Sequence, residues 1–451
     1  MSVPVAYGID FGTSNSAISA YLSDGEVEVI DTDPSTAGML PSLLYLHRDG
    51  NQLAGTNAAE AFLTSGTDKT RCRGCALVDW FGGEALSDCR QVRDGGFCMD
   101  ARLISQIKSS LSDTHLEGTH SWGRDFDMSA LVVIVLGHLK RAADRHYSVD
   151  VRRVAIGHPV RFAGAEGPQF KEAQALACSR LKEAAHEAGF DEVALVPESQ
   201  AAIALEGVTD GYVMCTDFGG GTFDCSVVDV LGINLTILAL DGVAVGGEDF
   251  DSLIFDAFIC PAIGLDREFV LGNGQTRQLP ARLRSRLRSL SGLRMLLADP
   301  ETVGMLSGFG GLGGDVTLDT VGELLFGGQA LPFYRAIEKA KIDLSLHNQA
   351  SVDFRRPWID LHETITRDQF EQLLTRSMQR VRDCMLDACA SARIDAEDVT
   401  FVTKTGGSSQ IPAFAALLRT VFPHANLIEC DPFTAVVKGL AEFAGGEWGN
   451  A

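Results

Sequence analysis

Positive charge is scarce in this chain. Its 451 residues include 38 lysines and arginines against 60 aspartates and glutamates, which leaves a formal net charge of -22. Nucleic-acid binding depends on a positively charged surface, so we expect no nucleic-acid partner. A polyanionic ligand would have to be bound locally, by backbone N–H groups, a cation or a few lysines rather than by the overall field.

Long hydrophobic runs are missing as well. The longest, Ala130–Leu136, is far shorter than the ~20 residues that a helix needs to span a bilayer. Met1–Pro4 lacks the basic region that begins a signal peptide. We therefore expect a cytoplasmic protein with no membrane partner. The hydrophobic content of 45% is that of a globular chain that can bury a sizeable core.

Two common nucleotide-site signatures are absent or incomplete. The sequence G-x-x-x-x-G-K-[ST] does not occur. Asp-Phe-Gly occurs twice, at Asp10–Gly12 and Asp217–Gly219, and protein kinases place this triplet at magnesium. However, Ala54 stands where a kinase needs asparagine after His47–Asp49, and the G-x-G-x-x-G run at Gly308–Gly313 follows both triplets. These departures argue against a kinase and favour a surface loop at Gly308–Gly313.

An internal repeat is present instead. When Asp10 is aligned on Asp217, Gly12 falls on Gly219, and strands are predicted in the same order around both turns. The repeat predicts two related lobes. The predicted strands are Val5–Ile9, Ala17–Leu22, Val27–Asp31, Val151–Gly157, Val193–Val196, Tyr212–Asp217, Cys225–Leu231, Leu235–Asp241, Thr400–Thr403 and Leu427–Cys430. The predicted helices are Ala130–Tyr147, Pro168–Gly189, Ser199–Glu206, Ile365–Ser391, Ala413–Val421 and Pro432–Phe443, with a mostly helical stretch over 246–347.

Each repeat places a carboxylate and a glycine turn at the end of a strand. Asp10 is followed by Gly12, Thr13, Ser14 and Asn15, and Asp217 by Gly219, Gly220, Gly221 and Thr222. Glycine lets the backbone approach a ligand closely, and successive N–H groups form a nest for phosphate oxygens. Two such turns facing each other would clamp a polyphosphate, with the aspartates on a hydrated magnesium ion. A third glycine turn at Thr405–Ser409 strengthens this interpretation.

At these turns the chain resembles a known family. "GIDFGTSNS", "TDFGGGTFDCS" and "TGGSSQIP" look like the phosphate-1, phosphate-2 and adenosine signatures of the heat shock protein 70 chaperones, in the actin-like ATPase superfamily. "VPESQAAIALEG" is similar to the helix that connects the family's lobes, "VGGEDFD" to its GGEDFD turn, and "EKAKIDLS" to its adenosine-contacting helix. "RRVAIGHPVRF" resembles the strand before the family's proline switch, with Pro159 at the proline. The resemblance covers almost the whole chain.

The resemblance implies an α/β chain with the two-lobed actin-like ATPase fold, in which duplicated ribonuclease H-like cores surround a central nucleotide cleft. Lobe I would cover 1–209, with its core at 1–40 and 126–209 and an inserted subdomain at 41–125. Lobe II would cover 210–428, with its core at 210–245 and 350–428 and an inserted subdomain at 246–349. Residues 429–451 would form a C-terminal helix that returns to lobe I.

The resemblance also implies ATP or ADP and Mg²⁺ as ligands. Asp10 and Asp217 would hold magnesium through water, Glu198 would orient the attacking water, Lys108 would contact the γ-phosphate, and Thr222 would assist. Because only a short K-S-x-L pattern supports Lys108, a solvated lysine remains the alternative there. The implied nucleotide-binding residues are Gly12, Thr13, Ser14, Asn15, Gly219, Gly220, Gly221, Thr222, Gly246, Gly247, Glu248, Glu338, Lys341, Ile342, Ser345, Gly406, Gly407, Ser408 and Gln410.

The chain departs from the family at the adenine site and at its end. Ile342 and Gln410 stand where the family sandwiches adenine between two arginines, so cation–π contacts are lost. An arginine from Arg282–Arg294 is a candidate replacement, and a solvated amphipathic helix is the alternative. The match ends with "DPFTAVVKGLAEF", which predicts the short YegD-like bacterial branch without a substrate-binding domain.

Four cysteines gather in the first inserted subdomain, at Cys72, Cys75, Cys89 and Cys98. C-x-x-C is typical of zinc knuckles, but the second pair is separated by eight residues rather than two. We therefore favour free or redox-active thiols over a structural zinc ion.

Three functions remain open at this point. The first is a slow magnesium-dependent ATPase that acts as a chaperone-like conformational switch toward an unidentified protein partner or client. The second is a nucleotide-binding scaffold that hydrolyses little. The third is a small-molecule kinase, which needs a catalytic aspartate between the hairpins. Asp191 or Asp210 can be named for this role by sequence position alone, because neither lies in a motif. The joint presence of Lys108, Glu198 and the two aspartates favours hydrolysis.

Overall fold

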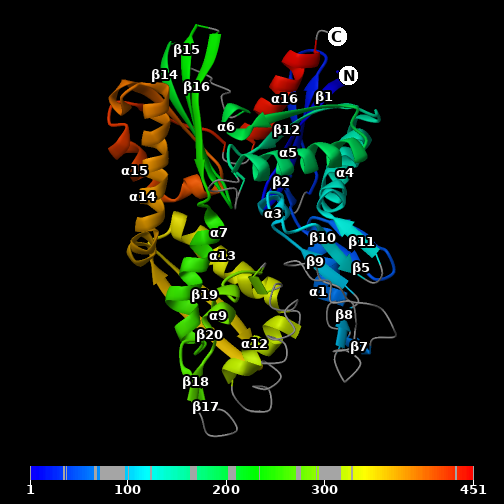
Figure 1. Cartoon of the computed structure of the whole chain (residues 1–451), viewed down its shortest axis with the longest axis vertical. Helices are drawn as coiled ribbons and strands as arrows, with labels where there is room; N and C mark the ends of the chain where they lie inside the picture. The colour runs from blue at the N-terminus through cyan, green and yellow to red at the C-terminus, as the bar shows by residue number, and fades with distance from the viewer. Residues whose placement is uncertain are drawn as a thin grey trace.

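The chain folds into two lobes, each built around one main β-sheet (Figure 1). In Figure 1 the two sheets stand side by side, and smaller subdomains lie below them. The computed structural model describes residues 2–33, 36, 38–65, 69–71, 97–99, 101–121, 124–162, 170–201, 210–232, 234–270, 276–290, 292–293, 316–326, 329–431 and 434–449.

The sheet of lobe I has the strand order β13-β12-β1-β2-β3, with β4 paired to β2. The hairpin of β1 and β2 encloses the first glycine turn, while β12 and β13 add to β1 in parallel. The strands are β1 (Pro4–Phe11), β2 (Asn15–Leu22), β3 (Val27–Ile30), β4 (Leu40–Pro41), β12 (Arg153–His158) and β13 (Glu192–Pro197).

The sheet of lobe II has the order β16-β15-β14-β21-β22. Its first three strands are antiparallel, and β21 and β22 add in parallel. This repeats the order and directions of lobe I, which confirms the predicted pair of related lobes. The strands are β14 (Asp210–Phe218), β15 (Phe223–Leu231), β16 (Asn234–Val243), β21 (Val399–Thr405) and β22 (Asn426–Glu429).

Helices cover both faces of the first sheet, which explains why its central strands are mostly buried. Tyr7 and Ile9 on β1 join a buried cluster with α4 (Met128–Tyr147) and α5 (Phe170–Glu187). Ala6, on the opposite face, joins a cluster with α16 (Ala435–Trp448). The last helix of the chain therefore packs on the first sheet (Figure 1).

Lobe II has the corresponding helices. Its buried cluster joins the sheet to α14 (Arg367–Ala392) and α15 (Pro412–Val421). Two short 3-10 helices, η4 (Ala396–Asp398) and η5 (Gly407–Gln410), flank β21. A short helix, α6 (Glu198–Ala201), contacts strands of both sheets as well as α16.

In its described residues, the inserted subdomain of lobe I contains a three-stranded sheet, short hairpins and two helices. Its elements are β5 (Leu44–His47), β6 (Gln52–Ala54), α1 (Thr56–Ser65), β7 (Lys69–Arg71), β8 (Phe97–Met99), β9 (Ala101–Ile104), α3 (Ile107–Ser110), β10 (Gly118–Ser121) and β11 (Arg124–Asp127). The inserted subdomain of lobe II contains α7 (Gly247–Ile254), a π-helix η3 (Phe255–Ile259), α8 (Cys260–Ala262), β17 (Glu268–Val270), β18 (Thr276–Gln278), α9 (Ala281–Arg286), α12 (Val316–Phe326) and α13 (Ala330–Leu346).

A hairpin after α13 corrects one part of the sequence interpretation. The strands β19 (Gln349–Arg356) and β20 (Ile359–Thr366) were not predicted, and the helix expected from Ile365 begins only at Arg367. The hairpin packs against α13 and pairs with no strand of the main sheet. We therefore place it with the inserted subdomain rather than with the core segment 350–428.

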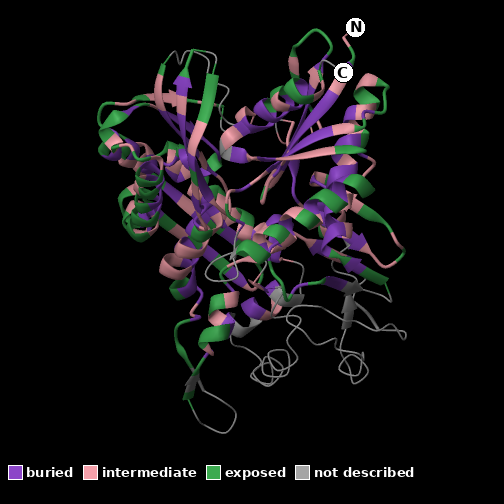
Figure 2. Cartoon of the chain, turned by 45° about the horizontal axis from the view of Figure 1, so that its top comes forward, coloured by how far each residue is buried: buried purple, intermediate pink, exposed green. Residues whose placement is uncertain are grey.

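The strands that carry the glycine turns are largely buried in both lobes (Figure 2). Phe11 and Phe218, the phenylalanines of the two Asp-Phe-Gly triplets, are both fully buried. In each triplet the buried phenylalanine therefore anchors the end of the strand, while the aspartate and the glycine belong to the turn. In the described part of the chain, no helix is long and apolar enough to cross a membrane.

Candidate functional site

A buried ion pair lies where the two lobes meet. Lys108 Nζ, on α3, is 2.6 Å from Glu198 Oε1, on α6, and their side chains are 9% and 6% exposed. Both residues were predicted as catalytic, and the structure places them in direct contact although 90 residues separate them. Lys108 is therefore not the solvated lysine that was the alternative.

Asp10 and Asp217 lie beside this pair, one from each lobe. Burial raises the pKa of Asp10 to about 7, the charge of Glu198 adds to the rise, and Lys108 opposes it. Burial also raises the pKa of Asp217 well above its ordinary value, with further contributions from Glu198 and Asp10. Lys108, Glu198, Asp10 and Asp217 therefore interact electrostatically, and three carboxyl groups share a single ammonium group.

Asp224 is a member of this cluster that the sequence interpretation missed. It is fully buried on β15, and its Oδ1 accepts a hydrogen bond of 2.7 Å from the backbone N–H of Val160 in lobe I. Burial raises its pKa to about 7, with Glu198 adding to the rise and Thr222 hydrogen-bonding to it. Its sequence signal was available, because Asp224 is the second aspartate of the "TDFGGGTFD" stretch.

The two glycine turns face each other across the lobes. A side chain added to Gly220 would lie 2.6 Å from Ser14 Oγ, and one added to Gly221 would lie 3.1 Å from Thr13 Oγ1. The carbonyls of Gly219 and Gly220 accept hydrogen bonds from the backbone at Gly247 and Glu248. The predicted phosphate-binding segments are therefore brought together, and a side chain at Gly220 would force Ser14 to shift.

The third glycine turn closes against the second one. Gly406 has a φ of +84°, and a side chain there would come within 2.4 Å of both Asp217 Oδ1 and Phe218 O. Ser408 Oγ donates a hydrogen bond of 2.7 Å to Gly219 O. A Cβ at Gly247 would lie only 2.9 Å from Ser408 Oγ. Glycine is thus required at Gly406 by both backbone conformation and close packing.

The residues predicted to hold the ribose and base lie on or near α13. Lys341 donates to Gly247 O at 3.1 Å and pairs with Asp251 Oδ2 at 2.9 Å, which the sequence interpretation had not assigned. Ile342 is 52% exposed, so an apolar side chain stands open to solvent beside Lys341. Glu338 acts electrostatically on Lys341, and Ser345 Oγ approaches Lys341 O at 3.5 Å.

Other predicted residues are placed apart from this cluster or are not described. Gly407 and Gln410 are exposed on η5, and Asn15 begins β2, where it pairs with Pro41. Of the cysteine cluster, Cys72, Cys75 and Cys89 lie outside the described residues, and of Cys98 only the backbone, in β8, is described. No group of three or more His, Cys, Asp or Glu residues is arranged to hold a metal in the described part of the chain.

The arginine-rich segment lies against the start of α13. Tyr334 Oη donates to Leu287 O at 2.6 Å, and Arg288 pairs with Asp256 at 2.9 Å. Tyr334 precedes Ile342 by two helical turns on α13, a rise of ~12 Å. The structure therefore gives no support to an arginine of this segment as the replacement for the adenine contacts.

The loop after β12 forms a second bridge between the lobes. Arg161, two residues after Pro159, pairs with Asp241 of β16 at 2.9 Å. Asp241 carried no motif in the sequence, so this contact could be found only in three dimensions. Together with the Val160–Asp224 hydrogen bond, it ties the proline-containing loop of lobe I to the sheet of lobe II.

The duplicated sheets and the convergent cluster define a two-lobed actin-like ATPase fold. The family described as "Hsp70 protein" matches residues 6–268 and 331–449. The chain therefore belongs to the heat shock protein 70 family, as its motifs predicted. The internal stretch that the family does not match, 269–330, falls within the predicted inserted subdomain of lobe II.

Curated relatives agree with this assignment. The chain is 23% identical over 96% of its length to "Heat shock 70 kDa protein, mitochondrial" from Solanum tuberosum, and covers 54% of that protein. It is 22% identical to "Chaperone protein DnaK" from Thermosipho melanesiensis, covering 58% of it, and 26% identical to "Chaperone protein HscA homolog" from Burkholderia mallei, covering 57%. The chain spans about half the length of these relatives. Its assignment to a short YegD-like branch stays a prediction.

The chemistry of the cluster fits a hydrated magnesium ion. Asp10, Asp217, Asp224 and Glu198 bring four carboxyl groups around one lysine. Burial raises the pKa of Asp10, Asp217 and Asp224, and the charge of Glu198 adds to each rise. A divalent cation relieves repulsion between carboxylates, and magnesium favours a few carboxylates plus water. The described residues offer no matching support for zinc.

Proposed function

We propose that the chain binds ATP with magnesium between its lobes and hydrolyses it slowly, and that the lobes change their relative arrangement with the bound nucleotide. The observation that carries this proposal is the convergence of Asp10, Lys108 and Glu198 from lobe I with Asp217 from lobe II, beside two facing glycine turns. Family membership supports the same function.

Each group has a task that its chemistry suits. The backbone N–H groups of the turns around Gly12 and Gly220 bind phosphate oxygens, as successive amides do in nests. The Lys108 ammonium neutralises charge on the transferred phosphoryl group, and the Glu198 carboxylate accepts a hydrogen bond from the attacking water. Asp10 and Asp217 would hold a hydrated magnesium ion, which would neutralise phosphate charge.

A second candidate function is a nucleotide-binding scaffold with little turnover. It is favoured by one observation, the direct contact of Lys108 with Glu198 at 2.6 Å. In that arrangement each group satisfies the other, and nucleotide must separate them before either can act on substrate. A chain that binds nucleotide without separating them would switch its shape but not hydrolyse.

The small-molecule kinase has no comparable support. Asp191 is exposed before β13 and pairs with Arg152, while Asp210 begins β14 and accepts a hydrogen bond from the Gly232 N–H. Both lie at the opposite ends of the strands from the glycine turns, so neither is near a phosphate bound there.

One assay separates the two main candidates. Calorimetric titration with ADP, ATP and GTP, with and without magnesium, measures binding, and single-turnover hydrolysis measures chemistry. We expect magnesium-dependent binding, slow release of phosphate, and loss of that release in Glu198→Ala with binding retained. Binding without turnover, equal in wild type and Glu198→Ala, would support the scaffold. Absence of nucleotide binding by the wild type would contradict both.

The partner of this switch is expected to be a protein. The relatives of the chain are named as heat shock proteins and chaperones, and we propose that a protein client or regulator binds this chain in one nucleotide state. We place this interaction in the cytoplasm. Crosslinking in cells, followed by capture in the presence of ATP or ADP, tests both the partner and the compartment.

A further inference from the structure

The short helix that carries Lys108 begins at a strained residue. Gln106, the residue before α3, has φ 58° and ψ 33°, which is the left-handed region. Only two other described non-glycine residues, Ser148 and Arg393, have positive φ. For a residue with a Cβ this conformation costs of order 1 kcal/mol, so another contact must hold Gln106 in place.

That contact comes from the other lobe. The side chain of Gln106 hydrogen-bonds to the carboxyl group of Glu248, in the first turn of α7. The backbone N–H of Glu248 also donates to Gly220 O at 2.8 Å, in the second phosphate turn. Glu248 thus joins the glycine turn of lobe II to the residue that precedes Lys108 in lobe I. Burial raises the pKa of Glu248 to about 8, and the hydrogen bond from Gln106 opposes this rise.

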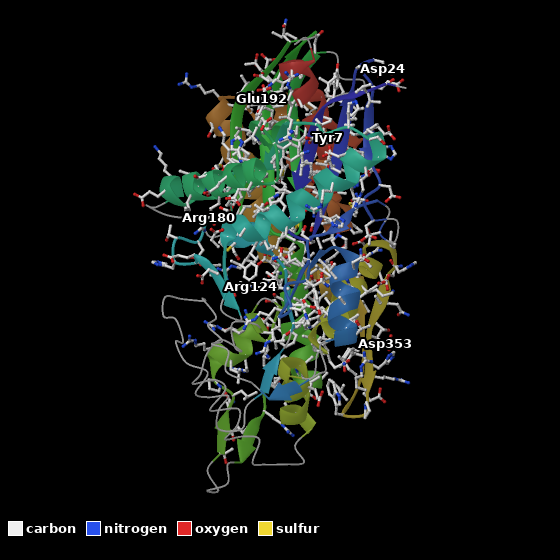
Figure 3. The ribbon with its side chains drawn as sticks, turned by 90° about the vertical axis from the view of Figure 1, so that its right-hand side faces the viewer. Tyr7, Asp24, Arg124, Arg180, Glu192 and Asp353 are labelled. Atoms are coloured by element: carbon white, nitrogen blue, oxygen red, sulfur yellow. The ribbon has the colours of Figure 1, made fainter. Side chains whose placement is uncertain are left out.

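The other end of the same segment is fixed within lobe I. Arg180 of α5 donates hydrogen bonds to Leu111 O, Asp113 O and Leu116 O, at 2.8, 3.0 and 2.7 Å. Arg180, which lies on α5, is labelled in Figure 3. The α3 segment is therefore anchored to lobe I after the helix and to lobe II before it.

The groups between these two anchors face the reaction centre. Lys108 contacts Glu198 and is affected by the charges of Asp10 and Asp217. The hydroxyl of Ser109 lies 3.4 Å from where a Cβ on Gly221 would be. A shift of the N-terminal end of α3 would move both side chains relative to the phosphate turns.

From this arrangement we propose that Gln106 and Glu248 form an interlobe bridge that positions Lys108, so that the lysine is correctly placed only when lobe II is closed onto α3. Glu248, predicted from the family resemblance to bind nucleotide, acts here through Gln106 instead. This inference rests on the proposed ATPase function. Both are positioning residues, since neither is required to touch the substrate.

The bridge predicts a specific pattern of kinetics. Gln106→Ala and Glu248→Ala should each lower the single-turnover rate by about 10²-fold, because small misplacements of catalytic groups have effects of that size. The dissociation constant for ADP should change little. The double variant should be no slower than either single variant, because both remove the same contact. Glu248→Gln, whose amide oxygen still accepts the bond, should stay near the wild-type rate.

Two controls separate the contact from the backbone strain. Gln106→Gly relieves the left-handed strain but also removes the amide, so it should be as slow as Gln106→Ala. Arg393→Gly makes the same backbone change at the left-handed residue that ends α14, and it should leave the rate unchanged. A wild-type rate in Gln106→Ala, or effects of the two alanine variants that multiply, would overturn the bridge.

A measurement independent of turnover completes the test. Amide hydrogen exchange at Ile107–Ser110 should be faster in Gln106→Ala and Glu248→Ala than in wild type, in nucleotide-free protein, and unchanged in Arg393→Gly. Unchanged exchange in both alanine variants would refute the bridge even if the wild type hydrolyses ATP. If the wild type binds no nucleotide but exchange is still faster in the two alanine variants than in the wild type, the bridge is supported and the proposed ATPase function is refuted.

Discussion

The two lobes have the same order of strands and helices, but different side chains pack between sheet and helix in each. Tyr7 of lobe I and Met214 of lobe II occupy the same position, three residues before the Asp-Phe-Gly aspartate. Tyr7 donates a hydrogen bond to Asp144 at 3.1 Å, and Lys140 pairs with Asp144 at 2.6 Å, all between β1 and α4 (Figure 3). Met214 joins an apolar cluster instead.

The core of lobe II also gathers aromatic rings at the end of the same strand, β14. Phe218 meets Phe223, Phe250 and Phe414 edge to face, with ring centroids 5.3, 5.7 and 5.0 Å apart. The order of strands and helices is the same in both lobes, so it does not depend on whether the layer between sheet and helix is polar or apolar. What the shared topology requires is a filled layer with every buried polar group satisfied.

The largest expected effect tests the polar layer of lobe I. Replacing Lys140 in Lys140→Met leaves Asp144 without its cation, so we expect a loss of about 3 kcal/mol in unfolding free energy, measured by urea denaturation. Turnover per folded molecule should be unchanged, because Lys140 is remote from the glycine turns. A variant as stable as wild type would show that the polar layer contributes no more than an apolar one.

The same variant has a pH signature. The hydrogen bond from Lys140 holds the pKa of Asp150 below its ordinary value. A depressed folded pKa adds stability above the unfolded pKa, and this contribution is lost as the pH falls through the folded value. In Lys140→Met the carboxyl of Asp150 should titrate closer to its ordinary pKa, as followed by NMR.

The second effect tests the asymmetry of the reaction centre, to which lobe I contributes the lysine. Lys108→Met should reduce the single-turnover rate by about 10²–10³-fold, the usual loss when a group that stabilises developing charge is removed. Binding of ADP should be affected much less than the rate, and calorimetry checks that the variant retains its site. A rate within a few-fold of wild type would remove Lys108 from the mechanism.

A third prediction concerns the turn that closes lobe II. Gly406→Ala combines a positive φ with a clash at 2.4 Å against Asp217 and Phe218, and we expect a loss of about 2–3 kcal/mol in unfolding free energy. Gly232→Ala has positive φ but open space, and should lose about 1 kcal/mol. Gly446→Ala, within α16 with open space, should gain about 0.5–1 kcal/mol. Equal effects at all three sites would contradict the close approach at Gly406.

The smallest expected effect is at the bridge after β12. Arg161 is 45% exposed in its side chain, so its pair with Asp241 should contribute less than 1 kcal/mol. Arg161→Ala should therefore change stability little, and the difference should shrink further in high salt. A loss well above this, unaffected by salt, would mean that the loop acts through more than this ion pair.

Much of this arrangement could be predicted from sequence, because local signals and the repeat agreed. The glycine turns, the strands around them and the buried Phe11 and Phe218 follow from residue type and spacing. The hairpin β19–β20 was missed although Ala350, Val352 and Phe354 alternate along it, because this period-two pattern is short and lies between two long helical patterns.

The contacts that join the lobes could not be predicted from the sequence, for a different reason. Asp224, Asp241 and Gln106 gain their roles only from partners 64, 80 and 142 positions away, at Val160, Arg161 and Glu248. No local pattern marks such residues, since their identity is constrained by a neighbour in space. Family resemblance also assigned Glu248 to the nucleotide, where the structure gives its carboxyl group a protein partner.

The route of the chain between the lobes limits how they can move. It leaves lobe I after α6 and returns before α16, and these two helices touch each other. A single connecting segment would let one lobe rotate about it in any direction, whereas two adjacent crossings together define one hinge axis. If the lobes open as proposed above, the movement is a rotation about one line through α6 and α16, so a small displacement at that line becomes a large displacement at the far edges of the inserted subdomains.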